Sequence, residues 1–437
     1  MDTEKLKQKI LDLAIRGKLV PQDPNDESAE ELIKRIQEEK AKLVKEGKIK
    51  ASKEESVIFK GSDNCYYEKT TKRIIKVDEN FEFPKSWISM KLGNIGDWGA
   101  GATPNRSNKS YYENGDVLWV KTGELNDGYI FDSIEKITTK ALNECSLRNN
   151  NIGDVLIAMY GATIGKLGIT AVPLTTNQAC CACTPFSFIN NEYLFYYLMA
   201  IKPLLISKSY GGAQPNISKE KITNCFINFP KIDEQILIVN KIKELFKKIE
   251  TIGNEYNSII NLISATKRKV LEEIFGENSS YKSYYENEYF LGDLLPYEQP
   301  ALYIVKSTNY DDKYDTPVLT PGKSFILGYT NEKEGVYHVN NSKVIIFDDF
   351  TTASRIIDFD FKVKSSAMKI LKSSDETKFN IDYLFFLLQS LYVNNDTHKR
   401  YWISEFATKK VKVHTFEEQL KIVKNINEFY DILDSIL

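Results

Sequence analysis

A long amphipathic helix with heptad spacing constrains the fold of this chain more than any other feature. From Glu234 to Phe275 the apolar positions follow one another at steps of four and three residues. They are Ile238, Ile242, Leu245, Ile249, Ile252, Tyr256, Ile259 and Ile263. One long helix packed on a globular core is the alternative, but an unbroken heptad pattern favours a seam between two helices, as in a coiled coil.

The C-terminal end of the chain repeats the start of this helix. The segment "EEQLKIVKNINEFYDILDSIL" aligns with "DEQILIVNKIKELFKKIETI" at a shift of 184 residues. Under this shift each seam position meets an apolar residue of the second segment, namely Ile422, Ile426, Phe429, Leu433 and Ile436. A match at every seam position predicts an internal repeat in which each copy ends in a long helix.

The N-terminus resembles the missing continuation of the second long helix. In "QKILDLAIRGKL", Ile10 matches Val270 of "RKVLEEIFGEN". The shift of 184 places the counterpart of Val270 17 positions after the last residue, Leu437. If the N-terminus followed directly on Leu437, Ile10 would stand 10 positions after it. The difference is seven residues, which is one heptad. This pattern predicts a circularly permuted, pseudo-symmetric chain whose second long helix is cut in two, with its tail at the front.

Two globular blocks of mixed strands, turns and short helices lie between the helical parts. Their ends correspond, because "NEYLFYYLMA" and "IDYLFFLLQS" are each followed by a loop, a strand and a heptad helix. The predicted parts are N-terminal helices that belong to the second coiled-coil region (1–44), a basic linker with a short hairpin (45–80), a first block (81–232), a central long helix (233–276), a second block (277–416) and a C-terminal helix (417–437).

Length and composition limit the class of protein. A chain of 437 residues with 42% apolar residues predicts two to four soluble domains. Because 58 Lys and Arg nearly balance 60 Asp and Glu, a DNA-binding chain would have to concentrate its basic residues locally. The charged N-terminus is not a signal peptide, and no apolar run reaches the ~18 residues of a membrane helix, so we expect a cytoplasmic protein without membrane contact.

The stretch "MYGATIGKLGI" looks like a nucleotide-binding loop but lacks the residues that one needs. A Walker loop has the pattern G-x-x-x-x-G-K-[ST]. Here only three residues separate Gly161 from Gly165, and Leu167 stands where Ser or Thr would hold magnesium. A strand pattern follows, so the stretch is better explained as a tight turn between strands. The adenine-binding Asn-Pro-Pro-aromatic turn of a methyltransferase is also missing, and we predict no catalytic residue and no cofactor for this chain.

A metal-dependent endonuclease is the enzymatic alternative. Asp358, Asp360 and Lys362 in "RIIDFDFKVK" resemble an acid–lysine motif. Period-two alternation explains the motif equally well, because it would place these residues and Lys364 on one face of a strand. The clustered Cys180, Cys181 and Cys183 have no second cysteine pair and no neighbouring histidine, so we expect buried, reduced thiols and no metal site.

Polar loops rich in Gly, Thr, Asn, Gln and Lys remain as the stretches that can carry function. Asn and Gln side chains pair with adenine edges, and Arg or Lys with guanine, whereas hydroxyls and backbone N–H groups hold phosphates. Each loop can equally be a solvated turn. The candidate DNA-binding residues are Thr103, Asn105, Arg106, Lys121, Thr122, Tyr160, Thr163, Lys166, Asn177, Gln178, Gln214, Asn216, Lys323, Thr351, Thr352, Ser354, Arg355, Lys364, Lys399, Arg400 and Trp402.

The chain resembles the specificity (S) subunits of type I restriction–modification systems over nearly all of its length. The resemblance depends on "LKQKILDLAIRGKLVPQDPNDESAEELI", "WVKTGEL", "YGATIGK", "TNQA", "GGAQPNISKEKI", "FPKIDEQ" and "FTTASRIIDFDFKVKSSAMKIL". The first of these strings is common in the central region of the family. It stands at the N-terminus here, consistent with a permuted order.

The resemblance implies an α+β protein: two globular mixed α/β target-recognition domains joined by long antiparallel coiled-coil helices, with pseudo-twofold symmetry. Each domain would read one half of a bipartite site in double-stranded DNA. Two modification (M) subunits would bring S-adenosylmethionine, and restriction (R) subunits would bring ATP and magnesium. The chain itself would be non-catalytic. A coiled-coil scaffold without DNA contact is a further alternative.

One departure from the resemblance concerns the second block. It has no counterpart of "GATIGK", and "FTTASR" takes its place. The two half-sites are therefore expected to differ in sequence.

Overall fold

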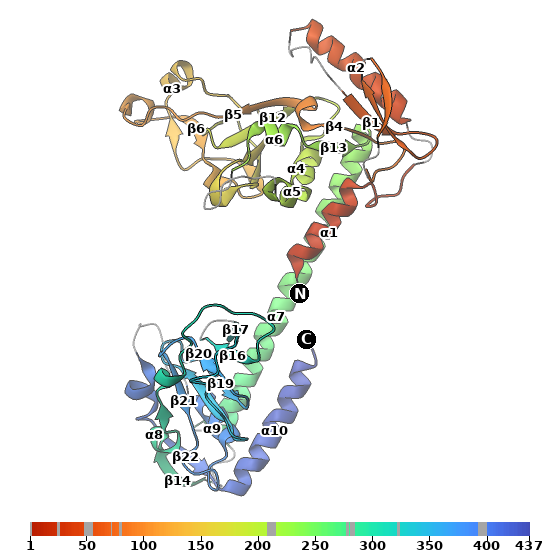
Figure 1. Ribbon diagram of the computed structural model, residues 1–437. Coiled ribbons are helices and arrows are strands. Elements are labelled where there is room, and N and C mark those ends of the chain that lie inside the picture. Colours follow the sequence, from red (N-terminus) through yellow and green to blue (C-terminus); the bar gives the residue numbers. More distant parts are fainter. Residues whose placement is uncertain are drawn as a thin grey trace. The chain divides into compact units, whose positions relative to one another are not determined.

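The computed structural model describes residues 2–23, 27–47, 56–70, 72–77, 81–207, 216–276, 279, 285–320, 324–391 and 400–437. It divides into a first unit, Met1–Asn254, and a second unit, Glu255–Leu437 (Figure 1). Helix α7 (Ile232–Phe275) contributes its beginning to the first unit and its end to the second.

The first unit is built on three sheets. A five-stranded sheet has the order β13-β4-β1-β2-β3, a second has the order β5-β12-β9-β10-β7, and a three-stranded sheet has the order β11-β6-β8. The strands are β1 (Ser56–Lys60), β2 (Tyr66–Thr70), β3 (Ile74–Val77), β4 (Ile88–Lys91), β5 (Gly96–Ala100), β6 (Val117–Val120), β7 (Gly128–Ile130), β8 (Lys136–Ile137), β9 (Val155–Ala158), β10 (Leu167–Thr170), β11 (Thr175–Thr176), β12 (Cys180–Pro185) and β13 (Phe226–Phe229). The helices are α1 (Thr3–Ile15), α2 (Ala29–Lys45), α3 (Thr139–Glu144), α4 (Asn191–Ala200), α5 (Lys202–Ser207) and α6 (Lys219–Thr223).

Within the segment 45–80, the described residues 56–70 and 72–77 contain strands and are not the linker that the composition suggested. Its strands β1, β2 and β3 extend the sheet that begins with β13 and β4. Val57 and Ile58 are buried, and α2 covers this part of the sheet. The predicted short hairpin is present as the antiparallel pair β1 and β2, but its place in a larger sheet was not predicted, because its apolar residues are few and lie among charged ones. Helix α2 packs on this sheet. It is therefore not part of a coiled coil, although a coiled coil was predicted for residues 1–44.

Helix α1 packs antiparallel on the beginning of α7, as the coiled-coil prediction requires. Thr3 lies beside Gly253. One turn further along α1, the Lys7 ammonium lies 5.9 Å from the ring centroid of Phe246.

The second unit repeats the architecture with fewer strands. Its sheets have the orders β14-β22, β15-β21-β18-β19 and β17-β16-β20. The strands are β14 (Tyr285–Phe290), β15 (Tyr297–Glu298), β16 (Thr316–Leu319), β17 (Ile326–Thr330), β18 (Val344–Asp348), β19 (Ser354–Ile357), β20 (Lys362–Val363), β21 (Met368–Leu371) and β22 (Lys410–His414). The helices are α8 (Leu291–Leu294), α9 (Ile381–Ser390) and α10 (Phe416–Asp434).

Helix α10 packs antiparallel on the end of α7. The Lys267 ammonium pairs with the Asp434 carboxylate at 2.6 Å, and the Tyr430 hydroxyl donates to Lys267 O at 3.1 Å. Ile422 and Leu271 lie in the same buried cluster. The seam is not continuous, however. Ile252 and Ile259, both predicted seam residues, are 50% and 40% exposed.

A buried glutamine confirms the internal repeat in atomic detail. Gln235, at the start of α7, accepts a hydrogen bond from Asn190 N at 2.9 Å. Its amide donates to Phe188 O at 2.9 Å and Pro230 O at 2.8 Å. Gln419 of α10, at the predicted shift, makes the same three bonds, with Asn380 N, Lys378 O and His414 O. Asn190 and Asn380 also cap α4 and α9 in the same way.

None of the helices that the structure describes has the length and apolar character needed to cross a membrane.

Candidate nucleic-acid interface

The glycine-rich stretch of the first unit connects two antiparallel strands. β9 pairs with β10, and residues 159–166 lie between them. Gly165 N donates to Ala158 O at 2.9 Å and closes the connection. Gly161 and Gly165 both have left-handed backbones, with φ of 66° and 75°. A strand follows the glycines and not a helix, so the prediction of a tight turn is confirmed.

The stretch "FTTASR" occupies the same place in the second unit. β18 pairs antiparallel with β19, and Thr352 N donates to Asp348 O at 2.9 Å, as Gly165 N does to Ala158 O. Thr352 also has a left-handed φ of 62°. A β-branched residue rarely adopts this conformation, which costs about 1–3 kcal/mol. The second unit therefore keeps a strained threonine where the first unit has glycine, and such strain is most often retained at functional positions.

Two further segments lie against each connection. In the first unit Met159 N donates to Ala179 O at 2.8 Å, and Ile217 N donates to Met159 O at 2.9 Å. The second unit has the same two bonds, from Asp349 N to Ala367 O and from Tyr401 N to Asp349 O. In this way the fold gathers several of the predicted DNA-binding residues around each connection.

Most of the predicted DNA-binding residues lie on the surface. The exposed ones are Thr103, Asn105, Arg106, Tyr160, Gln178, Asn216, Thr351, Arg355, Lys364 and Arg400. The half-buried ones are Lys121, Thr122, Thr163, Lys166, Asn177, Thr352 and Ser354. Gln214, Lys323 and Lys399 lie outside the described residues.

The prediction for Trp402 is wrong. Its side chain is fully buried, and its ring packs against Phe347 and Phe406. The sequence shows an indole in a basic stretch, but the backbone forms a π-helical turn at this point and directs the ring into the core. Trp402 therefore supports the interface from within and offers no ring to DNA.

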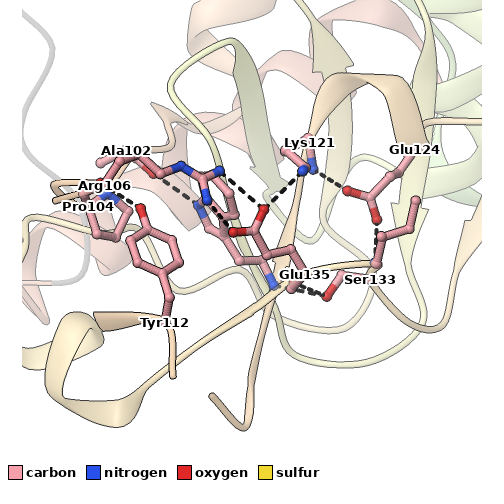
Figure 2. A network of polar contacts seen from close by, with 10 residues as sticks. Ala102, Pro104, Arg106, Tyr112, Lys121, Glu124, Ser133 and Glu135 are labelled. Atoms are coloured by element: carbon pink, nitrogen blue, oxygen red, sulfur yellow. Dashed lines mark hydrogen bonds and ion pairs between the residues drawn. The ribbon is translucent and has the colours of Figure 1, made fainter. Parts of the chain in front are cut away.

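An arginine in the first unit is held on three sides (Figure 2). The Arg106 guanidinium lies 4.6 Å from the ring centroid of Tyr112 and 4.8 Å from that of Trp119. Glu135 accepts hydrogen bonds from both terminal nitrogens of Arg106 and one from the Lys121 ammonium at 2.9 Å. The Arg106 hydrogen bond is the main cause that lowers the pKa of Glu135 below its ordinary value. The carboxylate therefore stays charged at neutral pH.

The remaining residues of the first site are linked to this cluster. Asn177 N donates to Val120 O, directly before Lys121. The Thr103 hydroxyl donates to the Gln178 side chain. Tyr160 and Asn216 form an isolated β-bridge beside the glycine turn. Main-chain pairing thus links amide, hydroxyl and cationic side chains into one surface.

The corresponding surface of the second unit carries different groups. The Arg355 guanidinium lies 4.6 Å from the ring centroid of Phe325. The Lys364 ammonium lies 3.5 Å from the Tyr310 hydroxyl. The Thr351 hydroxyl donates to the Asp348 carboxylate.

Sequence reasoning missed two residues of these surfaces. Phe350 is 40% exposed and stands where the first unit has Tyr160, which is 43% exposed. The alignment of "FTTASR" with the glycine turn was a signal for Phe350. Glu135 was missed because it comes 29 residues after Arg106, and only the pairing of β6 with β8 brings it near.

The residues of the nuclease alternative do not share one face. Lys362 is 1% exposed; its ammonium donates to Glu334 O and Gly335 O and pairs with Glu332 at 3.2 Å. Asp360 is exposed and its carboxylate lies 2.6 Å from His338 Nδ1. The alternation that was expected over 358–364 is wrong, because β20 contains only two residues.

The cysteines of β12 are buried, free thiols, as predicted. Burial raises the pKa of Cys181 to about 12 and also raises those of its neighbours Cys180 and Cys183. Thiols of this kind are inert, because the thiolate is the reactive form. Among the described residues no group of His, Cys, Asp or Glu is arranged to hold a metal ion.

Comparison with known proteins agrees with this organisation. Residues 84–261 match the family model of the type I restriction modification DNA specificity domain. The specificity subunit of the Escherichia coli type I restriction enzyme EcoR124I/EcoR124II is 47% identical over 147 residues, 33% of this chain and 36% of that subunit. The MjaIX specificity subunit of Methanocaldococcus jannaschii is 27% identical over 310 residues, 68% of each chain.

A solved structure has the same fold. It concerns complex assembly and conformational transition of the type I R-M system; its chain has a TM-score of 0.59 at 15% identity, and the match covers 82% of this chain and 93% of that one. The matched stretch spans about a third of the EcoR124I/EcoR124II subunit and about two thirds of the MjaIX subunit. The domain match and the relatives show that this chain is similar in sequence to type I restriction–modification specificity subunits, and the solved structure shows that the fold is shared.

Proposed function

We propose that this chain is the DNA-reading subunit of a type I restriction–modification complex. Each unit reads one half of a bipartite site in double-stranded DNA, and the helices α1, α7 and α10 serve as the spacer. The chain carries out no chemical step. Two M subunits methylate adenine with S-adenosylmethionine, and R subunits use ATP and magnesium to cleave DNA, in the cytoplasm.

One observation carries the proposal: the same main-chain framework presents different side chains in the two units. Asn177 N donates to Val120 O, the last residue of β6. Lys364 N donates to Leu319 O, the last residue of β16, so Lys364 stands in the second unit where Asn177 stands in the first. Arg400 likewise stands where the first unit has Asn216, because the residues that follow them, Tyr401 and Ile217, donate from their N–H groups to the equivalent carbonyls of Asp349 and Met159. Amide side chains suit adenine, whereas Lys and Arg suit guanine. A repeated framework with exchanged polar groups is what reading two unlike half-sites requires.

The surface chemistry supports recognition over catalysis. The exposed groups around both connections include amides, hydroxyls, cations and aromatic rings, and the carboxylates of Asp348 and Asp349 beside the second connection are buried. These groups bind bases and phosphates. The acid–lysine motif of the nuclease alternative is divided between a buried cation and an exposed carboxylate. The curated relatives in the comparison are likewise specificity subunits.

The test is a map of methylated adenines in DNA from cells that carry this chain with its M subunit. We expect a two-part motif with a fixed spacer, which disappears when the gene for this chain is deleted. The matched control is the same strain with the M subunit alone. An adenine pattern that is contiguous, or that persists without this chain, would contradict the proposed function.

A further inference from the structure

Both the backbone before Arg106 and the Arg106 guanidinium are held in place by neighbouring aromatic residues. The Trp119 indole donates to Ala102 O at 3.0 Å, and the Tyr112 hydroxyl donates to Pro104 O at 2.6 Å. These two rings therefore fix the backbone on the N-terminal side of Arg106 and also flank its guanidinium. A planar guanidinium held in one orientation has the geometry that bidentate base reading requires.

Glu135 is held in place as firmly as the arginine. The Ser133 hydroxyl donates to Glu135 O at 2.7 Å and accepts from Trp119 N at 3.1 Å. Glu124 accepts from Ile134 N and from Lys121 N at 2.7 and 2.9 Å. The short segment before Glu135 is therefore tied to β6 at two points. The carboxylate reaches Arg106 and Lys121 from a fixed position.

The charges of this cluster matter for DNA binding. Arg106 and Lys121 are two cations, and Glu135 neutralises one of their two charges. Two free cations would bind phosphates of any sequence, and each phosphate contact steepens the dependence of affinity on salt. A carboxylate in this position lowers affinity for arbitrary DNA, yet it leaves the remaining N–H groups of a fixed guanidinium free for a base edge.

We propose that Glu135 is a specificity-determining residue of the first unit that acts without touching DNA. It positions Arg106 toward a base edge and prevents Arg106 and Lys121 from binding phosphates indiscriminately. This inference rests on the proposed function. It adds that discrimination at one half-site depends on an acidic residue, although the bound polymer is itself an anion.

The test compares Glu135→Gln with the unchanged chain, each in complex with M subunits. Affinity is measured for three DNAs: the intact site found by adenine mapping, a site in which the half read by the first unit (the first half) is scrambled, and a site in which the half read by the second unit (the second half) is scrambled. Each is measured over a range of salt concentrations. Glu244→Gln is the matched control, because Glu244 likewise accepts from two lysines, Lys241 and Lys248, but does so on α7.

We expect Glu135→Gln to lower discrimination against the scrambled first half by about tenfold, the range of one good base contact. Affinity for that scrambled DNA should rise, and its salt slope should steepen by about 1. Discrimination at the second half should not change, and Glu244→Gln should behave as the unchanged chain.

Two outcomes would overturn the inference alone. In one, the unchanged complex discriminates and Glu135→Gln matches it. In the other, Glu135→Gln weakens binding to all three DNAs in parallel with an unaltered salt slope, as a merely structural residue would. An unchanged complex that binds intact and scrambled sites equally would instead overturn the proposed function, and the inference with it.

Discussion

Replacing Lys369 by methionine is expected to lower the free energy of unfolding of the second unit by about 3–5 kcal/mol. Lys369 and Asp349 have side chains that are 0% and 1% exposed, and they form an ion pair at 3.5 Å. The substitution leaves the Asp349 carboxylate buried without its cation. Urea unfolding of the full chain, with hydrogen exchange followed in residues 285–437, measures the loss.

The first unit supplies the control for this prediction. Its strand pairing places Met159 and Cys181 at the positions of Asp349 and Lys369. Both are buried. The double variant Asp349→Met with Lys369→Cys should therefore recover most of the loss, since an apolar pair commonly replaces a buried ion pair at little cost. Recovery should fall short by about 1 kcal/mol, because Asp349 also accepts from Trp402 N. A single variant as stable as the unchanged chain would contradict this account.

Replacing Gln235 by alanine is expected to destabilise the first unit by about 3 kcal/mol or more. The change leaves one half-buried N–H and two buried carbonyls without their partner, and each unsatisfied buried group costs about 1–3 kcal/mol. Gln419→Ala removes the equivalent three bonds and should destabilise the second unit by a smaller amount, because only the bond to His414 O is fully buried. Urea unfolding measures the size of each effect, and hydrogen exchange shows which unit opens.

The control for both glutamines is Gln8→Ala. Gln8 is half-buried, and among the described residues its side chain donates one hydrogen bond, to Ala200 O at 2.9 Å. Its loss should cost about 1 kcal/mol or less. If Gln235→Ala costs no more than Gln8→Ala, or opens the second unit as readily as the first, the internal repeat does not depend on these buried amides.

The repeat could be read from the sequence because it is written in local pattern. Gln235 and Gln419 follow an acidic residue at the same shift as the heptad seam, and the two turns follow equivalent apolar strands. Helical spacing, strand composition and turn glycines are local properties, so the long helices, the matching ends of the two blocks and the turn at the glycines were predictable.

The errors concern burial, which depends on contacts between distant residues. Lys362 looked like a surface cation but is enclosed by Glu332 and two carbonyls from another part of the chain. Trp402 was predicted to bind DNA but fills the core. Glu135 carried no signal, since a carboxylate near the middle of a polar loop is ordinary until its two cations are placed beside it.

The most direct test of the central claim, that each unit reads its own half of the site, compares Asn177→Ala with Lys364→Ala. These residues occupy the same place in the two units. Methylation by the complex with M subunits is measured on DNA libraries in which one half of the site is randomised at a time, with Lys424→Ala of α10 as the control. Our account predicts that each variant relaxes the sequence requirement at one half only, a different half for each, by roughly tenfold. Variants that relax both halves together, or that relax the same half, would contradict it.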